Sequence, residues 1–118
     1  MASSTPTQVA TVQLGAAVAT HYTVATGRRL IITRVTLLNT TATDRTVDFH
    51  LVPTGGSADG TNQILDGKTI ESNLVVTEPY LVAGAERQVL EGGGTIQVGA
   101  SAATAITMVI SGVLVVTG

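Results

Sequence analysis

The stretch RLIITRVTLLNTTATDRTVDFHLVP, residues 29–53, alternates apolar and polar side chains in two runs separated by a polar interruption. Side chains alternate between the two faces of a β-strand, so a period of two predicts strands rather than helices. In the first run Ile31, Val35 and Leu37 share one face, with Thr33 between them. The opposite face holds Ile32, Arg34, Thr36 and Leu38.

The second run has the same alternation. Val47, Phe49 and Leu51 share one face, and we expect Phe49 to be buried between two sheets. Asp48 and His50 lie on the other face. The connection between the two runs, residues 40–44, is polar, so the two strands are predicted to form a hairpin.

Further strands are expected on both sides of this stretch, with turn signals at close spacing. Before it they cover residues 9–14, with Ala10, Val12 and Leu14 on one face, and residues 21–24. After it they cover residues 63–65, 74–82, 86–90, 95–101 and 105–116. In the strand at 95–101 the residues expected inward are Ile96, Val98 and Ala100, and in the strand at 105–116 they are Ile106, Met108 and Ile110. About eight short strands predict an all-β chain, a single antiparallel β-sandwich or jelly-roll-like domain.

Glycine and proline refine this prediction. Gly112 interrupts the last run, which indicates a bulge or a bend there. Pro53 and Pro79 lack a backbone donor, so they belong at strand ends or sheet edges. Residues 83–85 and 91–94 are expected to form turns.

The chain has 118 residues, which suits one domain. We divide it into an N-terminal arm or first strand, residues 1–14, and a β-sandwich domain, residues 15–118. The first seven residues are expected to form a mobile arm or to clip onto a neighbour. They lack the basic and apolar regions of a signal peptide, and no apolar run approaches the ~18 residues of a membrane helix, so no membrane partner is expected.

The composition limits the possible functions. Only 12% of the residues are charged, the formal net charge is −2, and the chain has one lysine, so a nucleic-acid partner is not expected. Three aromatic residues offer little surface for stacking sugars or bases. There is no cysteine, which excludes disulfides and thiolate metal sites. About a quarter of the residues are charged in a typical soluble domain, so the low charge favours a surface covered by neighbours; a weakly charged monomer is the alternative.

The loop GGSADG, residues 55–60, has the glycine spacing of a phosphate-binding loop. Such a loop continues with Lys and then Ser or Thr, and it leads into a helix. Here Thr61 and Asn62 follow, and then a short strand is predicted. We therefore interpret the loop as a corner between strands, crossing from one sheet to the other.

Few residues could form a chemical site. Asp48 and His50 could pair, or they could provide two metal ligands. A zinc site needs three or four protein ligands, and His21 is the only other histidine. A surface Asp–His pair near Arg34 or Arg45 is therefore the preferred interpretation. Catalytic residues, metal ligands and cofactors are each predicted as none. Two further possibilities stay open, calcium binding in an acidic loop and contact of Arg28 and Arg29 with an acidic partner. The acidic residues concerned are Asp59, Asp66, Glu71 and Glu78.

Several segments together resemble a group of small virion proteins of tailed bacteriophages. They are HYTVATGRR at 21–29, the strand and threonine-rich step at 31–43, FHLVPTGGSA at 49–58 with NQIL at 62–65, EGGGTIQV at 91–98 and ISGV at 110–113. Residues 74–82 depart from the pattern of that group. The resemblance implies a β-sandwich that serves as a virion component, and it implies no catalytic residue.

The resemblance and the composition together lead to a functional expectation. We expect a non-enzymatic capsid decoration or cement protein on the capsid surface of the virion, which binds the major capsid protein and stabilises the head. Self-association as a homotrimer would suit the threefold positions of a shell. The alternative is a tail-tip or fibre domain that contacts a host receptor, and a small hydrolase is the third hypothesis.

Overall fold

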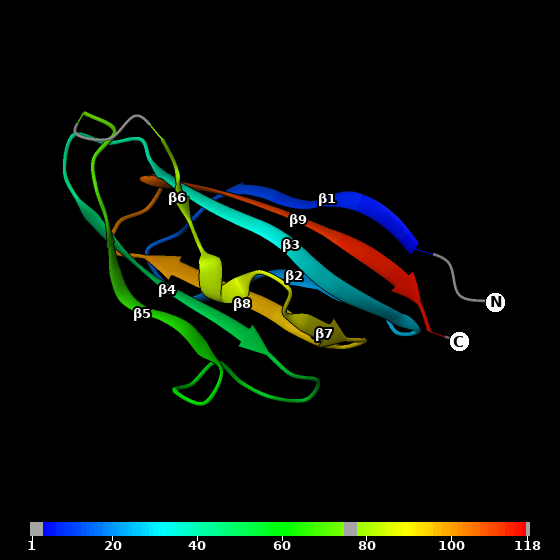
Figure 1. Cartoon of the computed structure of the whole chain (residues 1–118). Coiled ribbons are helices and arrows are strands. Elements are labelled where there is room, and N and C mark those ends of the chain that lie inside the picture. Colours follow the sequence, from blue (N-terminus) through cyan, green and yellow to red (C-terminus); the bar gives the residue numbers. More distant parts are fainter. Residues whose placement is uncertain (1–3, 75–77, 118) are drawn as a thin grey trace.

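The computed structural model describes residues 4–74 and 78–117, which form two antiparallel sheets packed face to face (Figure 1). The prediction of an all-β sandwich is confirmed. In the described residues the strands are β1 (Ser4–Gln13), β2 (Ala19–Thr23), β3 (Arg28–Asn39), β4 (Arg45–Val52), β5 (Gln63–Ile70), β6 (Tyr80–Leu81), β7 (Val89–Glu91), β8 (Thr95–Ala100) and β9 (Ile106–Val116). One short 3-10 helix, η1 (Ala83–Ala85), lies where a turn was expected.

The chain winds as one long hairpin. A five-stranded sheet has the order β1-β9-β3-β6, with β7 also pairing β3, and a four-stranded sheet has the order β2-β8-β4-β5. The first strand therefore neighbours the last, β2 neighbours β8, and β4 neighbours β5 at the tip of the hairpin. Folding such a hairpin over itself gives the two-sheet arrangement of a jelly roll.

Two predicted connections are wrong, and in opposite ways. β3 and β4 do not form a hairpin, because they belong to different sheets and residues 40–44 cross between them. Residues 53–62 do not cross between sheets, because they join the antiparallel neighbours β4 and β5. Polar and glycine-rich composition predicts a turn in both places but does not say which sheet the next strand joins.

A buried asparagine stabilises the crossing between the sheets. Asn39 at the end of β3 donates from Nδ2 to the carbonyl oxygens of Thr43 (2.8 Å) and Ile70 (3.0 Å). Its Oδ1 accepts from the backbone N–H of Thr41 (2.9 Å) and from the Thr41 hydroxyl (2.6 Å). All four hydrogen-bonding positions of the amide are satisfied, as burial requires.

The first run of the opening stretch holds a β-bulge that shifts its alternation. The pairing of β3 with β9 slips between Ile32 and Arg34. As a result Ile32 is buried and Ile31 lies on the opposite face from Val35, so the predicted shared face of Ile31, Val35 and Leu37 is correct only for the last two. The slip lies opposite Gly112, where a Cβ atom would come within 2.7 Å of the Ile31 carbonyl oxygen. An irregularity is thus found at Gly112, but the extra residue lies on the partner strand β3 and not in the strand of the glycine, where it was predicted.

The core lies between the two sheets. Phe49 of β4 is fully buried, and all three residues predicted inward on β8 and on β9 are buried too. Val47 is buried as well, and Leu51 packs against the core from the edge. Pro53 directly follows β4 and Pro79 directly precedes β6, so both stand at strand ends as predicted.

The two ends of the predicted strand pattern differ from expectation. Residues 4–13 form β1, which pairs with β9 of the same chain, so this part of the expected arm belongs to the sandwich. The strand predicted at 74–82 is reduced to β6, with residues 75–77 outside the described part. The strand predicted at 86–90 begins only at Val89, because η1 precedes it. Over the described ranges, no helix has the length and apolar character needed to cross a membrane.

Candidate binding surfaces

Asp48 stabilises an irregular part of β5. Its Oδ1 accepts a hydrogen bond from the backbone N–H of Gly67 (2.7 Å), and the Gln63 amide nitrogen lies 3.4 Å from the same oxygen. The pairing of β4 with β5 slips on either side of Phe49, which leaves backbone donors without a strand partner. Gly67 has a φ of 60°, a conformation that glycine adopts without strain. Asp48 therefore stabilises the bulged part of β5.

His50 holds the loop at the hairpin tip. Its side chain is only 5% exposed, and Nδ1 lies 3.0 Å from Oδ1 of Asn62 and 3.2 Å from the carbonyl oxygen of Asp59. Because both neighbours are acceptors, Nδ1 carries the hydrogen and donates it. The interpretation of Asp48 and His50 as a surface pair is therefore wrong, since each binds a different part of the chain that follows β4.

Asn62 connects the remaining groups of this loop. Its Oδ1 also accepts from the backbone N–H of Asp59 (3.1 Å), and its Nδ2 donates to the carbonyl oxygen of Ser57 (2.8 Å). The Asp59 carboxylate accepts from the backbone N–H and the hydroxyl of Thr61, and these two bonds lower the pKa of Asp59 below its usual value. The loop is thus closed by its own side chains. It leads into β5 and not into a helix, so it lacks the structure of a phosphate-binding loop.

The other candidate residues from the sequence lie apart. His21 contacts the carbonyl oxygen of Val98 through Nε2 (3.2 Å), and Arg29 forms an exposed ion pair with Glu91 (2.7 Å), which contributes little stability. Across residues 4–74 and 78–117, no three His, Asp or Glu side chains gather as metal ligands would. This includes the acidic residues considered for calcium.

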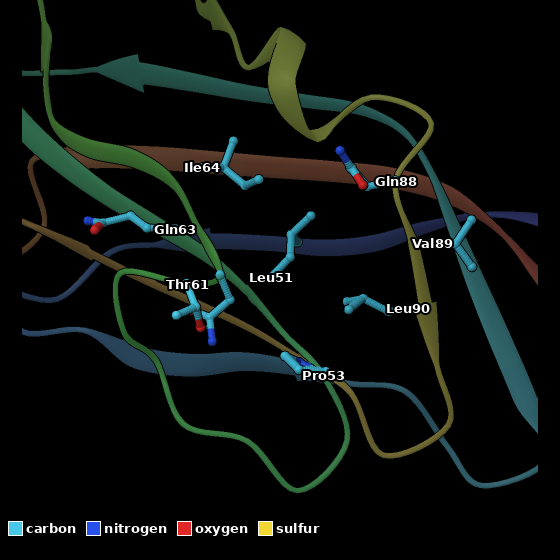
Figure 2. A pocket seen from close by; sticks show the side chains of 9 residues that line it. Leu51, Pro53, Thr61, Gln63, Ile64, Gln88, Val89 and Leu90 are labelled. Carbon is cyan, nitrogen blue, oxygen red and sulfur yellow. The ribbon is translucent and has the colours of Figure 1, made fainter.

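A groove opens where the two sheets part, next to the hairpin tip. Its volume is about 370 Å³. Figure 2 shows Leu51 of β4, Ile64 of β5 and Leu90 of β7 around the hollow. Its other lining residues are Pro53, Thr61, Asn62, Gln63, Gln88 and Val89. None of the nine is charged, so the groove has neither an acid–base pair nor a charged anchor for a ligand.

The outer side of the five-stranded sheet is the more unusual surface. Two rows of cross-strand neighbours run over it: one joins Pro6, Val113, Ile31 and Val89, and the other joins Thr11, Val109, Thr36 and Leu81. We call the six apolar residues of these rows the outer apolar face: Pro6, Ile31, Leu81, Val89, Val109 and Val113. Leu81 and Val89 are 42% and 47% exposed, and the chain buries neither row.

The outer side of the four-stranded sheet differs from it. Between β4 and β8 the outward pairs are Asp48 with Gly99, His50 with Gln97 and Val52 with Thr95. Four of these six residues are polar, and His50, Val52 and Gly99 are buried by other parts of the chain. The chain covers the outer apolar face of the five-stranded sheet less, and exposed apolar patches commonly mark interaction sites.

Sequence reasoning missed two kinds of feature here. The roles of Asn39 and Asn62 depend on backbone groups that only the fold brings near, although an asparagine beside threonine is a general turn signal. The outer apolar face depends on the bulge in β3, which turns Ile31 outward. Thr33, the residue before Arg34, does not indicate a bulge in the sequence.

His50→Ala should lower the free energy of unfolding by about 1–3 kcal/mol, because it removes a buried side chain and leaves two part-buried acceptors in the hairpin tip without their donor. If Asp48 and His50 formed a surface pair, as interpreted from the sequence, His50→Gln and Asp48→Asn would each change the free energy of unfolding by no more than about 1 kcal/mol. Urea unfolding of His50→Ala beside the matched control Thr20→Ala, at an exposed site of the same sheet, measures the difference. Equal unfolding midpoints for the two variants would contradict a role of His50 in holding the loop.

In comparisons with family models, with curated proteins and with solved structures, the chain matches none.

Proposed function

We propose that the protein is a non-enzymatic structural component of a bacteriophage virion, a decoration or cement protein that binds the major capsid protein on the capsid surface and stabilises the head. The observation that carries this proposal is the outer apolar face. A protein that works as a free monomer gains nothing from six apolar side chains on the solvent side of a sheet, whereas a protein covered by a neighbour does.

Two features of the sequence support the same function. The low charge, with six basic and eight acidic residues in 118, suits a chain whose surface is largely covered. The segments that resemble tailed-phage virion proteins span most of residues 20–117. The groove and the hairpin tip add no arrangement of acid, base and nucleophile of the kind that hydrolysis requires.

Virions of the phage that encodes the chain should contain it in hundreds of copies, because a cement protein repeats over the whole shell. Quantitative gel densitometry against the major capsid protein measures the copy number. A handful of copies per particle would instead support the alternative, a tail-tip or fibre domain that contacts a receptor. Light scattering of the purified protein provides a second readout, since the proposed homotrimer has three times the 12.0 kDa mass of one chain. Virions without the chain would overturn the proposal.

A further inference from the structure

One cation stands in the middle of the outer apolar face. Arg34 pairs across the sheet with Ser111, and Ser111 pairs with Gln8, so these three form a row of their own. This row lies between the row of Val113 and the row of Val109, because Ser111 lies between those two valines on β9. Arg34 therefore has Ile31 and Val113 on one side, and Val109 with Thr36 on the other.

Arg34 is exposed, and among the described residues no carboxylate lies within ion-pair distance of it. The other arginine on this side of the sheet, Arg29, already pairs with Glu91 at 2.7 Å. The outer apolar face therefore carries one uncompensated positive charge, although the whole chain has a formal net charge of −2. Covering the face without compensating that charge would be costly, because a buried charge needs a partner.

We infer that the outer apolar face is the surface that docks on the major capsid protein, and that the capsid protein presents there an apolar patch with a carboxylate opposite Arg34. This inference rests on the proposed function and specifies its contact. An arginine binds a carboxylate through two parallel hydrogen bonds, so the pair fixes the orientation as well as the position of the bound protein. The apolar rows on either side exclude water from the pair.

The charge distribution also disfavours a two-fold contact between two copies of the chain through this face. In a two-fold contact through the same surface, the same residues meet across the axis. Arg34 lies centrally, so such a contact would bring two guanidinium groups together, and like charges placed opposite each other oppose binding. A different surface with a carboxylate is therefore the better complement.

The test measures binding of the purified full-length chain to capsids that lack it, by co-sedimentation over a range of protein concentrations. We expect Arg34→Glu to raise the dissociation constant at least about thirtyfold, because it places a carboxylate against a carboxylate. Arg34→Lys should retain part of the affinity. Val113→Thr, which keeps the β-branched shape, should raise the dissociation constant about fivefold.

Lys68→Glu is the matched control, since it makes the same change of charge at an exposed position of β5 in the other sheet. It should bind like the unchanged chain. Thermal melting of every variant checks that the sandwich is folded. Binding of the unchanged chain should weaken as salt increases, and Arg34→Gln should lose most of that dependence.

The outcomes separate the two proposals. If the unchanged chain is absent from virions and binds no capsid, both the proposed function and this inference fail. If the unchanged chain binds capsids and the Arg34 and Val113 variants bind as tightly, the inference alone fails. If these variants change the oligomeric mass while capsid binding is unaffected, the face is a contact between copies of this chain and the inference is again overturned.

Discussion

Replacing Phe49 with alanine should lower the free energy of unfolding by about 3–5 kcal/mol. Phe49 is the only phenylalanine, and it is fully buried between the two sheets. It pairs with Val98 on one side and with Leu65 on the other, so it occupies the middle of the four-stranded sheet. Truncation removes apolar surface from the core and leaves a cavity that rigid strands on both sides cannot fill.

Chemical denaturation measures this loss, and Leu81→Ala is the control. Leu81 is 42% exposed on the outer side of the other sheet, so its truncation should cost much less than that of Phe49. A change below about 1 kcal/mol for Phe49→Ala would contradict the assignment of the inward face of β4. Equal losses for the two variants would do the same.

The alternation of residues predicted the faces of β4, β8 and β9 correctly because these strands face the core over most of their length. The inward positions of these strands then follow the period of two directly, as at Phe49 on β4 and at Ile106, Met108 and Ile110 on β9. On β3 the same rule failed, because one extra residue at the bulge moves every side chain before it to the other face. Gly112 indicates an irregularity in the sheet, but the sequence does not show which residue of the partner strand forms the bulge.

The topology was less predictable than the strands. Whether a polar connection turns within a sheet or crosses to the other one depends on where the whole chain packs. The crossing at residues 40–44 is held by Asn39, which binds the carbonyl oxygen of Thr43 within it and that of Ile70 at the end of β5. Residues 53–62 return because His50 and Asn62 close the loop above β4. These contacts join residues distant in sequence, and local composition does not encode them.

The candidate site shows the same limit. Asp48 and His50 could be singled out from the sequence because both are chemically versatile and share a face of one strand. Their partners are backbone groups and two side-chain amides in the segment from 59 to 67, and each residue binds a different part of it. The outer apolar face was indicated only indirectly, through the low charge of the whole chain.

Removing residues 1–14 should abolish cooperative folding, although the division of the sequence into an arm or first strand at 1–14 and a sandwich at 15–118 predicts that the sandwich folds without them. β1 is an edge strand of the five-stranded sheet, and nine residue pairs join it to β9. Leu14 is buried in the core, and Ala10 and Val12 pack against it. Without this segment β9 becomes a long apolar edge, and exposed edges of that kind promote aggregation.

The control for this truncation is a chain that begins at Ser4 and keeps the whole of β1. We expect it to melt cooperatively, with the circular dichroism of a β-protein, while the chain that begins at Gly15 is unfolded or aggregated. A chain from Gly15 that melts at the temperature of the control would show that residues 4–14 act as a separable arm. In that case the pairing of β1 with β9 adds nothing to stability, and the same segment is free to bind a neighbour. If the pairing is instead required for folding, β1 cannot detach to reach a neighbour, and contacts with neighbours must use surfaces of the folded sandwich. The outer apolar face is then the natural candidate, because five of its six residues lie on β3, β6, β7 and β9, and β1 adds Pro6 when it pairs with β9.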